Sequence, residues 1–161
     1  MSSTERVAVS AAVNASPARV FAIVSDPAGH VLIDGSGMLE AAPDARPLTA
    51  VGDAFEMDMD REPLGDLPMG KYKVVNTVTR IVPDALIEWN VGTPEYGPVG
   101  HVYGWEIVPD GPDRSTVTNY CDWSQIRQAV RDRVTFPVVP LAMMEKSVQR
   151  LAEVAEGPEP S

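Results

Sequence analysis

The feature that most constrains the fold is a change of hydrophobic period late in the chain. Between residues 53 and 123, apolar side chains recur at every second position in several segments, which is typical of half-buried strands. Between Leu141 and Glu156 they recur at helical spacing instead. The apolar stripe of this predicted helix consists of Leu141, Met144, Val148, Leu151 and Ala155.

The lengths of the two kinds of segment match. A helix of about sixteen residues spans about 24 Å, and a strand of about eight residues spans about 26 Å. One long helix can therefore lie across the concave face of one curved sheet and cover its apolar side.

Short alternating segments separated by turns predict an antiparallel sheet of about seven strands. Ser16-Pro17 and Asp26-Pro27 each place an N-cap residue before a proline, which predicts two short helices after the first strand. A weaker helical spacing, at Ile126, Val130 and Val134, follows the last strand. The predicted strands are Glu5–Val13, Met38–Ala42, Asp53–Asp60, Lys71–Val82, Ala85–Val91, Gly100–Val108 and Ser115–Trp123. The predicted fold class is α+β, a curved antiparallel sheet around a long C-terminal helix.

Composition limits the possible partners. The 161 residues fit a single domain over residues 1–161, with flexible ends expected at residues 1–4 and 157–161. Acidic residues outnumber basic ones 23 to 13, which argues against nucleic acid or an anionic membrane surface as the main partner. No apolar run approaches the roughly 20 residues of a membrane span, and the start lacks a signal-peptide core, so a cytoplasmic location is expected. The single cysteine, Cys121, excludes an internal disulfide and a cysteine-based zinc cluster.

Three stretches resemble a known superfamily. They are VNASPARVFAIVSDPAGH (Val13–His30), YGWEIVPDGPDRSTVTNYCDWS (Tyr103–Ser124) and LAMMEKSVQRLAEVAEG (Leu141–Gly157). Together they resemble the START and birch-pollen-allergen (SRPBCC) helix-grip superfamily, and look closest to actinobacterial polyketide cyclase/dehydrase-like and lipid-transport-like members. The resemblance implies a hollow between sheet and helix, open at one end, but no universal catalytic signature. The chain departs from many relatives at Leu32-Ile33 and in the long stretch Asp60–Gly70, both of which could reshape the mouth of the hollow.

The candidate ligand-binding residues are strand residues whose side chains alternate toward the concave face, together with two residues of the helix stripe. An apolar wall with a few polar groups is usual for a small-molecule site. The alternative is that these residues simply fill the core. The candidates are Phe55, Met57, Met59, Tyr72, Asn76, Trp89, His101, Tyr103, Trp105, Asn119, Met144 and Val148.

Asn76 and Asn119 are the most informative of these positions. A buried amide without partners costs on the order of 1–3 kcal/mol, so each side chain would bind a ligand or a buried water. The alternative is a register shifted by one residue, which would place both amides in solvent.

His101 and Tyr103 are the candidate catalytic residues. They share strand parity, and histidine has an unperturbed pKa near neutrality, so His101 is expected to be the group that titrates toward a ligand. The alternative places His101 at the rim, in water. His30 is expected to bond only a local turn, Cys121 is expected to be an inert buried thiol, and no metal or cofactor site is predicted.

Two charged clusters are interpreted as solvent-facing. Oxygen-ligand metal sites usually need a turn to converge their ligands, so three acidic residues on one strand face should point outward. Three arginines on the weak helical segment either form a solvated face or close over the hollow. The clusters are Glu56, Asp58 and Asp60, and Arg127, Arg131 and Arg133.

The sequence favours a carrier-like protein that binds a small hydrophobic or amphipathic molecule, because no carboxylate of inward parity is available as a general base. An alternative is a cyclase, aromatase or dehydratase that acts on a polyketide-like or aromatic substrate. A third hypothesis is a module that binds a partner protein, which would need an outer apolar patch. Neither the ligand nor an oligomeric state follows from the residues.

Overall fold

A computed structural model describes residues 5–65, 70–95 and 97–157. Flexible ends were expected at residues 1–4 and 157–161, and all of these except Gly157 lie outside the described residues. Residues 66–69, within the long stretch Asp60–Gly70, also lie outside them. Gly157 is described, and its N–H donates to the carbonyl of Glu153 at 3.1 Å.

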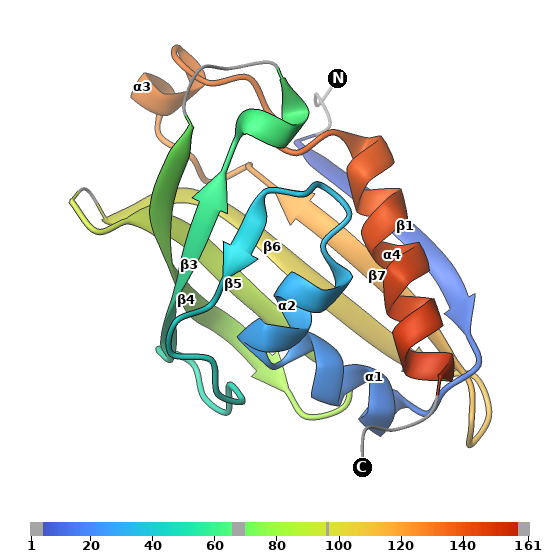
Figure 1. The fold of residues 1–161 in the computed structure, drawn as a ribbon. Helices are drawn as coiled ribbons and strands as arrows, with labels where there is room; N and C mark the ends of the chain where they lie inside the picture. Colours follow the sequence, from blue (N-terminus) through green and yellow to red (C-terminus); the bar gives the residue numbers. More distant parts are fainter. Residues whose placement is uncertain (1–4, 66–69, 96, 158–161) are drawn as a thin grey trace.

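Seven antiparallel strands form one sheet in the order β1-β7-β6-β5-β4-β3-β2. The sheet curves around the long C-terminal helix, as Figure 1 shows. The predicted α+β helix-grip architecture is therefore confirmed. The strands are β1 (Arg6–Val13), β2 (Leu39–Ala41), β3 (Ala54–Asp60), β4 (Lys71–Val82), β5 (Leu86–Thr93), β6 (Gly97–Pro109) and β7 (Ser115–Asp122).

The two short helices begin where their capping residues predict. Helix α1 (Pro17–Val24) starts after Ser16, whose hydroxyl accepts the N–H of Arg19 at 3.2 Å. Helix α2 (Pro27–Ile33) starts after Asp26, whose carboxylate accepts the N–H of Ala28 at 2.9 Å. Each cap satisfies a backbone N–H that has no partner inside its helix.

Helix α4 (Leu141–Glu156) matches the predicted bounds. Its buried residues are Met144, Val148, Leu151 and Ala155, and the helix lies against β1, β7, α1 and α2. Leu141 was expected on the same stripe but is exposed. The core thus forms between one stripe of α4 and the concave face of the sheet.

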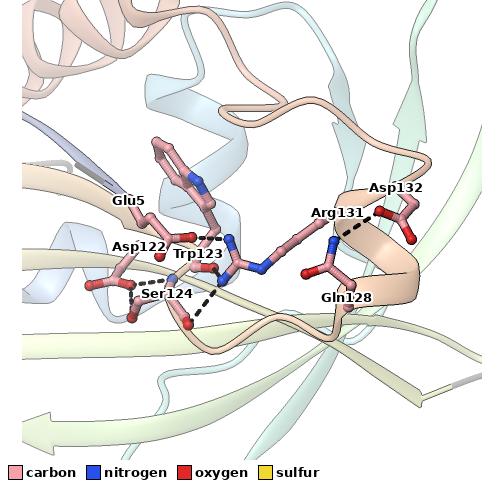
Figure 2. A network of polar contacts seen from close by, with 7 residues as sticks. All are labelled: Glu5, Asp122, Trp123, Ser124, Gln128, Arg131 and Asp132. Carbon is pink, nitrogen blue, oxygen red and sulfur yellow. Dashed lines mark hydrogen bonds and ion pairs between the residues drawn. The ribbon is translucent and has the colours of Figure 1, made fainter. Parts of the chain in front are cut away.

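The weak helical segment is shorter than its spacing suggested, because α3 spans only Gln128–Arg131. Arg131 holds it in place: its guanidinium pairs with Glu5 and donates to the backbone carbonyls of Trp123 and Ser124, the latter at 3.1 Å (Figure 2). The interpretation of Arg131 as a solvated side chain is wrong. Arg127 and Arg133 are exposed, as that interpretation expected.

The acidic cluster of β3 faces outward as predicted. Lys73 of β4 pairs with Glu56 at 3.1 Å and with Asp58 at 3.3 Å. Asp60 accepts the N–H of Glu62, the first residue of the 3-10 helix η1 (Glu62–Leu64), at 3.0 Å. Within the described ranges, no helix combines the length and apolar character that a membrane span requires.

Candidate functional site

A cavity of about 170 Å³ lies between the concave face of the sheet and helices α2 and α4. Ten of the twelve candidate ligand-binding residues line it, because strand parity directs alternate side chains to one face. They are Met57, Met59, Tyr72, Asn76, Trp89, His101, Tyr103, Trp105, Asn119 and Met144. The remaining two candidates, Phe55 and Val148, are buried in the core and do not line the cavity.

Most of the further lining residues come from segments outside the strands whose alternation was used for the prediction. Helix α2, the loop after it and the segment before α4 supply most of these. They are His30, Ile33, Asp34, Ser36, Met38, Leu39, Val138, Val139 and Ser147, together with Val74 and Val91 of the sheet.

Aromatic rings form one wall of the cavity. The ring of His30 stacks on Trp89 with centroids 4.6 Å apart, and Trp89 stacks on Tyr103 at 6.5 Å. Phe55 meets both His30 and Trp89 edge-on at 5.5 and 6.2 Å, which explains why it supports this wall without lining the cavity. The wall therefore presents flat surfaces to any molecule that enters.

Contrary to expectation, His30 does not bond the turn that follows it among the described residues, but places its Nε2 2.6 Å from the carbonyl oxygen of Val24 at the end of α1. A carbonyl only accepts, so Nε2 carries the proton and Nδ1 keeps its lone pair. Burial lowers the pKa of His30, which keeps the ring neutral. Its place in the cavity was missed, although Pro27, His30 and Ile33 share a three-residue spacing that marks the buried face of α2.

His101 is buried, with 5% of its surface exposed, so the rim position proposed as the alternative is wrong. Its ring contacts Tyr103 and Phe136 edge-on, with centroids 5.7 and 4.9 Å apart. Desolvation lowers the pKa of His101 to about 4. This lowered pKa argues against the expected titration of His101 near neutrality and favours the neutral imidazole.

Tyr103 and Cys121 are weak acids in this environment. Burial raises the pKa of Tyr103 well above its usual value, and the neighbouring Cys121 raises it further. Burial likewise raises the pKa of Cys121 to about 12, in agreement with an inert thiol. Neither group is poised to transfer a proton at neutral pH.

Most polar groups in the cavity wall are satisfied by the protein itself. The carboxylate of Asp34 accepts from the Ser36 N–H, the Ser36 hydroxyl and the Leu39 N–H, at 2.7 to 3.0 Å. Ser147 accepts the N–H of Gly35 at 2.8 Å, which ties this loop to α4. These side chains therefore shape the wall and have their strongest bonds already in use.

The two asparagines differ. Each has 6% of its surface exposed, so the shifted register is wrong for both. Asn119 donates to the carbonyl of Gly104 at 3.0 Å. Asn76 Oδ1 is buried and has no hydrogen-bond partner among the described residues, and the same holds for His101 Nδ1.

These two atoms stand out among buried polar atoms. Within the described part of the chain, four buried side-chain atoms lack a partner, and the other two are Arg19 Nε and Asn90 Oδ1, whose residues do not line the cavity. A buried acceptor without a partner costs on the order of 1–3 kcal/mol. Two residues of the cavity wall thus each contain a buried polar atom without a partner among the described residues.

The segment before α4 covers part of the cavity. Val138 and Val139 line it, and Phe136 lies between His101 and Trp123, whose ring stacks on it at 6.0 Å. Figure 2 shows that Arg131 and Glu5 anchor the start of this segment. No residue of the segment 136–139 was among the predicted ligand-binding residues, so this cover was missed.

The described residues contain no group of three or more histidine, cysteine or carboxylate side chains arranged to hold a metal ion.

Comparisons with known proteins identify the fold. No family model matches the chain. An uncharacterized protein of Mycobacterium tuberculosis strain H37Rv is 34% identical over 118 residues, which are 73% of this chain and 47% of that protein. The chain therefore spans about half the length of the curated relatives it matches.

Solved structures agree with the architecture. A structural-genomics protein from Chromobacterium violaceum shares 16% identity and a TM-score of 0.67, over 96% of this chain and 99% of that one. Norcoclaurine synthase from Thalictrum flavum, solved with dopamine and hydroxybenzaldehyde, shares 15% identity and a TM-score of 0.64, over 99% and 90%. The chain thus shares its helix-grip fold with these solved structures.

Proposed function

We propose that this chain binds a small, mainly apolar molecule in the cavity between the sheet and α4, and that it acts as a carrier-like binder without acid–base chemistry of its own. The cavity carries this proposal: about 170 Å³ of space is walled by aromatic, aliphatic and methionine side chains. Two of the lining residues, Asn76 and His101, also carry a buried polar atom that has no partner in the described part of the chain. Binding sites for small molecules typically combine such apolar walls with a few polar groups.

The size of the cavity limits the ligand. An engineered cavity of about 150 Å³ in another protein binds benzene. A cavity of about 170 Å³ therefore has room for one ring or a compact bicyclic compound. A long lipid chain or a multi-ring polyketide would extend beyond it.

An enzymatic role is the second hypothesis, since norcoclaurine synthase shares the fold. A general acid or base works best with a pKa near the working pH. Burial moves the pKa of both candidate catalytic residues away from neutral pH, because the pKa of His101 falls to about 4 and the pKa of Tyr103 rises. These pKa shifts favour a role in hydrogen bonding over a role in proton transfer.

Tryptophan fluorescence tests the proposed function. Trp89 and Trp105 line the cavity, whereas Trp123 does not. Titration with small aromatic and aliphatic compounds should change the emission saturably. The change should persist in Trp123→Phe and decrease in Trp89→Phe and Trp105→Phe.

Two outcomes would contradict the proposal. One is that no compound gives a saturable change in a folded sample. The other is that Trp123→Phe abolishes the response while Trp89→Phe and Trp105→Phe retain it. Native mass spectrometry of protein purified from its own host would then identify any molecule that co-purifies.

A further inference from the structure

We propose that the hydroxyls of Tyr72 and Tyr103 are the polar anchor of the cavity, and that they donate hydrogen bonds to the acceptor oxygen, carbonyl or carboxylate, of a compact and otherwise apolar molecule. This inference rests on the proposed function, because it names the class of molecule that the same cavity takes. Three features carry it: a ligand can reach both hydroxyls, both remain protonated, and the buried guanidinium of Arg61 acts on both.

The two hydroxyls differ from the buried polar atoms of the wall. Tyr72 and Tyr103 line the cavity and are only partly buried. Neither hydroxyl bonds a nitrogen or oxygen atom of the described residues, and neither is among the buried atoms without a partner. Asn76 Oδ1 and His101 Nδ1, in contrast, lie beneath the surface of the wall. The tyrosine hydroxyls are therefore the polar groups that a molecule in the cavity can contact.

The hydroxyls come from separate strands and approach each other across the cavity. Tyr72 of β4 is opposite Met59 of β3, and Tyr103 of β6 is opposite Trp89 of β5. They are near enough for a charge on Tyr72 to raise the pKa of Tyr103. Burial raises the pKa of both tyrosines, so both keep their protons at neutral pH and can donate.

Arg61 brings a positive charge to this part of the wall. It directly follows β3 and continues the alternation of Phe55 and Met57, which are buried on the concave side. The Arg61 side chain is likewise buried, with 4% of its surface exposed. Its Nη1 lies 3.7 Å from the sulfur of Met38, which lines the cavity, and its backbone N–H donates to the carbonyl of Gly70 at 3.0 Å.

The charge of Arg61 sets the polarity of the ligand. It opposes the effect of burial on the pKa of both Tyr72 and Tyr103, although Asp60 acts in the other direction on Tyr72. A cation beside a phenol strengthens the O–H as a donor and favours negative charge on the atom that accepts from it. A ligand N–H or O–H would place positive charge there instead. An acceptor oxygen is therefore the group that this position favours.

The remaining polar groups of the wall are poorly suited to such an oxygen. The carboxylate of Asp34 can only accept hydrogen bonds, and it already accepts three from Ser36 and Leu39. The Ser36 hydroxyl donates to Asp34, and the Ser147 hydroxyl donates to the carbonyl of Met143 at 3.2 Å. The two tyrosines thus supply the available hydroxyl donors.

Acetophenone and α-methylstyrene form a matched pair for the test. A CH₂ group replaces the carbonyl oxygen in α-methylstyrene, so the two molecules have nearly the same shape, and a cavity of about 170 Å³ admits either. Burial alone favours α-methylstyrene, which is the more apolar compound. Isothermal titration calorimetry should nevertheless show that acetophenone binds about fivefold more tightly, because its oxygen accepts hydrogen bonds.

Benzoate distinguishes the two sources of an acceptor oxygen. It keeps the ring and carries a charged carboxylate in place of the acetyl group. Tighter binding of benzoate than of acetophenone assigns the position to a carboxylate, and Arg61→Met should then remove that gain. The reverse order assigns it to an uncharged carbonyl. On either assignment, the preferred compound binds more tightly than α-methylstyrene.

Variants assign the preference to the hydroxyls. Tyr72→Phe and Tyr103→Phe each remove a hydroxyl and keep the ring, so each should reduce the preference for acetophenone. The double variant should bind acetophenone no more tightly than α-methylstyrene. Tyr120→Phe is the matched control, because it also removes a tyrosine hydroxyl but Tyr120 does not line the cavity, and it should keep the preference. Thermal melts confirm that each variant is folded.

The outcomes separate the two proposals. If α-methylstyrene binds the wild type as tightly as acetophenone and benzoate do, this inference is overturned and the proposed function remains intact. A preference that survives in the double variant overturns the assignment to Tyr72 and Tyr103. Failure of these compounds and of every compound in the tryptophan titration to bind a folded sample contradicts the proposed function and this inference together.

Discussion

Two groups of buried polar atoms, one on each face of the central sheet, differ in how fully they are paired. On the convex face, Glu88 of β5 accepts hydrogen bonds from Thr79 at 2.8 Å and from the hydroxyl of Tyr120, and pairs with Arg80 at 3.7 Å. On the concave face, Asn76 Oδ1 and His101 Nδ1 have no partner among the described residues. We call these the Glu88 cluster and the Asn76–His101 pair.

The comparison teaches how to distinguish a structural polar group from one that the fold leaves without a partner. A buried polar group that is fully paired contributes to stability, whereas one without partners reduces stability. Reduced stability is tolerated where a function needs the group. The account therefore predicts that changes to the Glu88 cluster lower stability, and that changes to the Asn76–His101 pair alter binding or pH dependence.

The largest effect is expected at Gly104. A Cβ there would lie 2.4 Å from the ring and hydroxyl of Tyr120, which is 1% exposed and crosses β6 to reach Glu88. Gly104→Ala should lower the free energy of unfolding by about 3 kcal/mol, because the ring must move and its bond to Glu88 is lost. Urea denaturation measures the change. In a Tyr120→Ala background the same substitution should cost less than about 1 kcal/mol, and a full cost there would contradict the assigned clash.

The second effect concerns the hydroxyl of Tyr120 alone. Tyr120→Phe keeps the ring, including its contact with the guanidinium of Arg6 at 4.2 Å, but removes a donor to Glu88. The free energy of unfolding should fall by about 2 kcal/mol, since bonds to charged groups are worth about 1.5–3 kcal/mol. Ligand binding should not change. Stability equal to that of the wild type would show that the Glu88 cluster contributes little.

The third effect is a pH dependence of stability that His101 controls. Its pKa is about 4 in the folded protein and 6.5 when unperturbed, so the unfolded chain takes up a proton first as the pH falls. Stability is then lost between pH 6.5 and pH 4, by about 1.5 kcal/mol at pH 5.5. His101→Gln should lose about 1.5 kcal/mol less than the wild type, because buried His30, whose pKa is also lowered, adds a loss of the same sign to both proteins. Denaturation curves at pH 7.5 and 5.5 measure it, and an equal loss in both proteins would place the His101 pKa near its ordinary value.

The smallest effect has the opposite sign. Asn76→Leu removes a buried acceptor that has no partner, so the free energy of unfolding should rise by about 1 kcal/mol or stay unchanged. The midpoint of denaturant unfolding measures this change. Asn119→Leu is the control and should be destabilising, because it removes the hydrogen bond that Asn119 donates to the carbonyl of Gly104. A clear loss of stability in Asn76→Leu would mean that the amide has a structural role.

Strand parity and capping residues allowed much of the fold to be predicted. Alternation placed Trp89, Trp105 and Asn76 on the concave face, because a strand sends successive side chains to opposite sides. Ser16 and Asp26 located both short helices through bonds that span only two or three residues.

Features that depend on distant contacts could not be predicted. His30 enters the cavity because α2 packs over the sheet, and Val138 does so because the segment before α4 folds back. The low pKa of His101 arises from burial, to which the distant Phe136 contributes a covering ring. The bond between Tyr120 and Glu88 crosses Gly104 on an intervening strand, and residue spacing carries no sign of it.

One measurement tests the central claim most directly: guanidinium denaturation of the wild type, Asn76→Leu and Tyr120→Phe, each with and without a compound that the tryptophan titration shows to bind. A ligand that binds only the folded state raises stability by about 2.7 kcal/mol at a hundredfold excess over its Kd. The account predicts that Tyr120→Phe loses stability but keeps the increase caused by this compound, whereas Asn76→Leu keeps its stability and changes that increase. If both variants lose stability and the effect of the compound together, the Glu88 cluster and the Asn76–His101 pair do not have the separate roles described above.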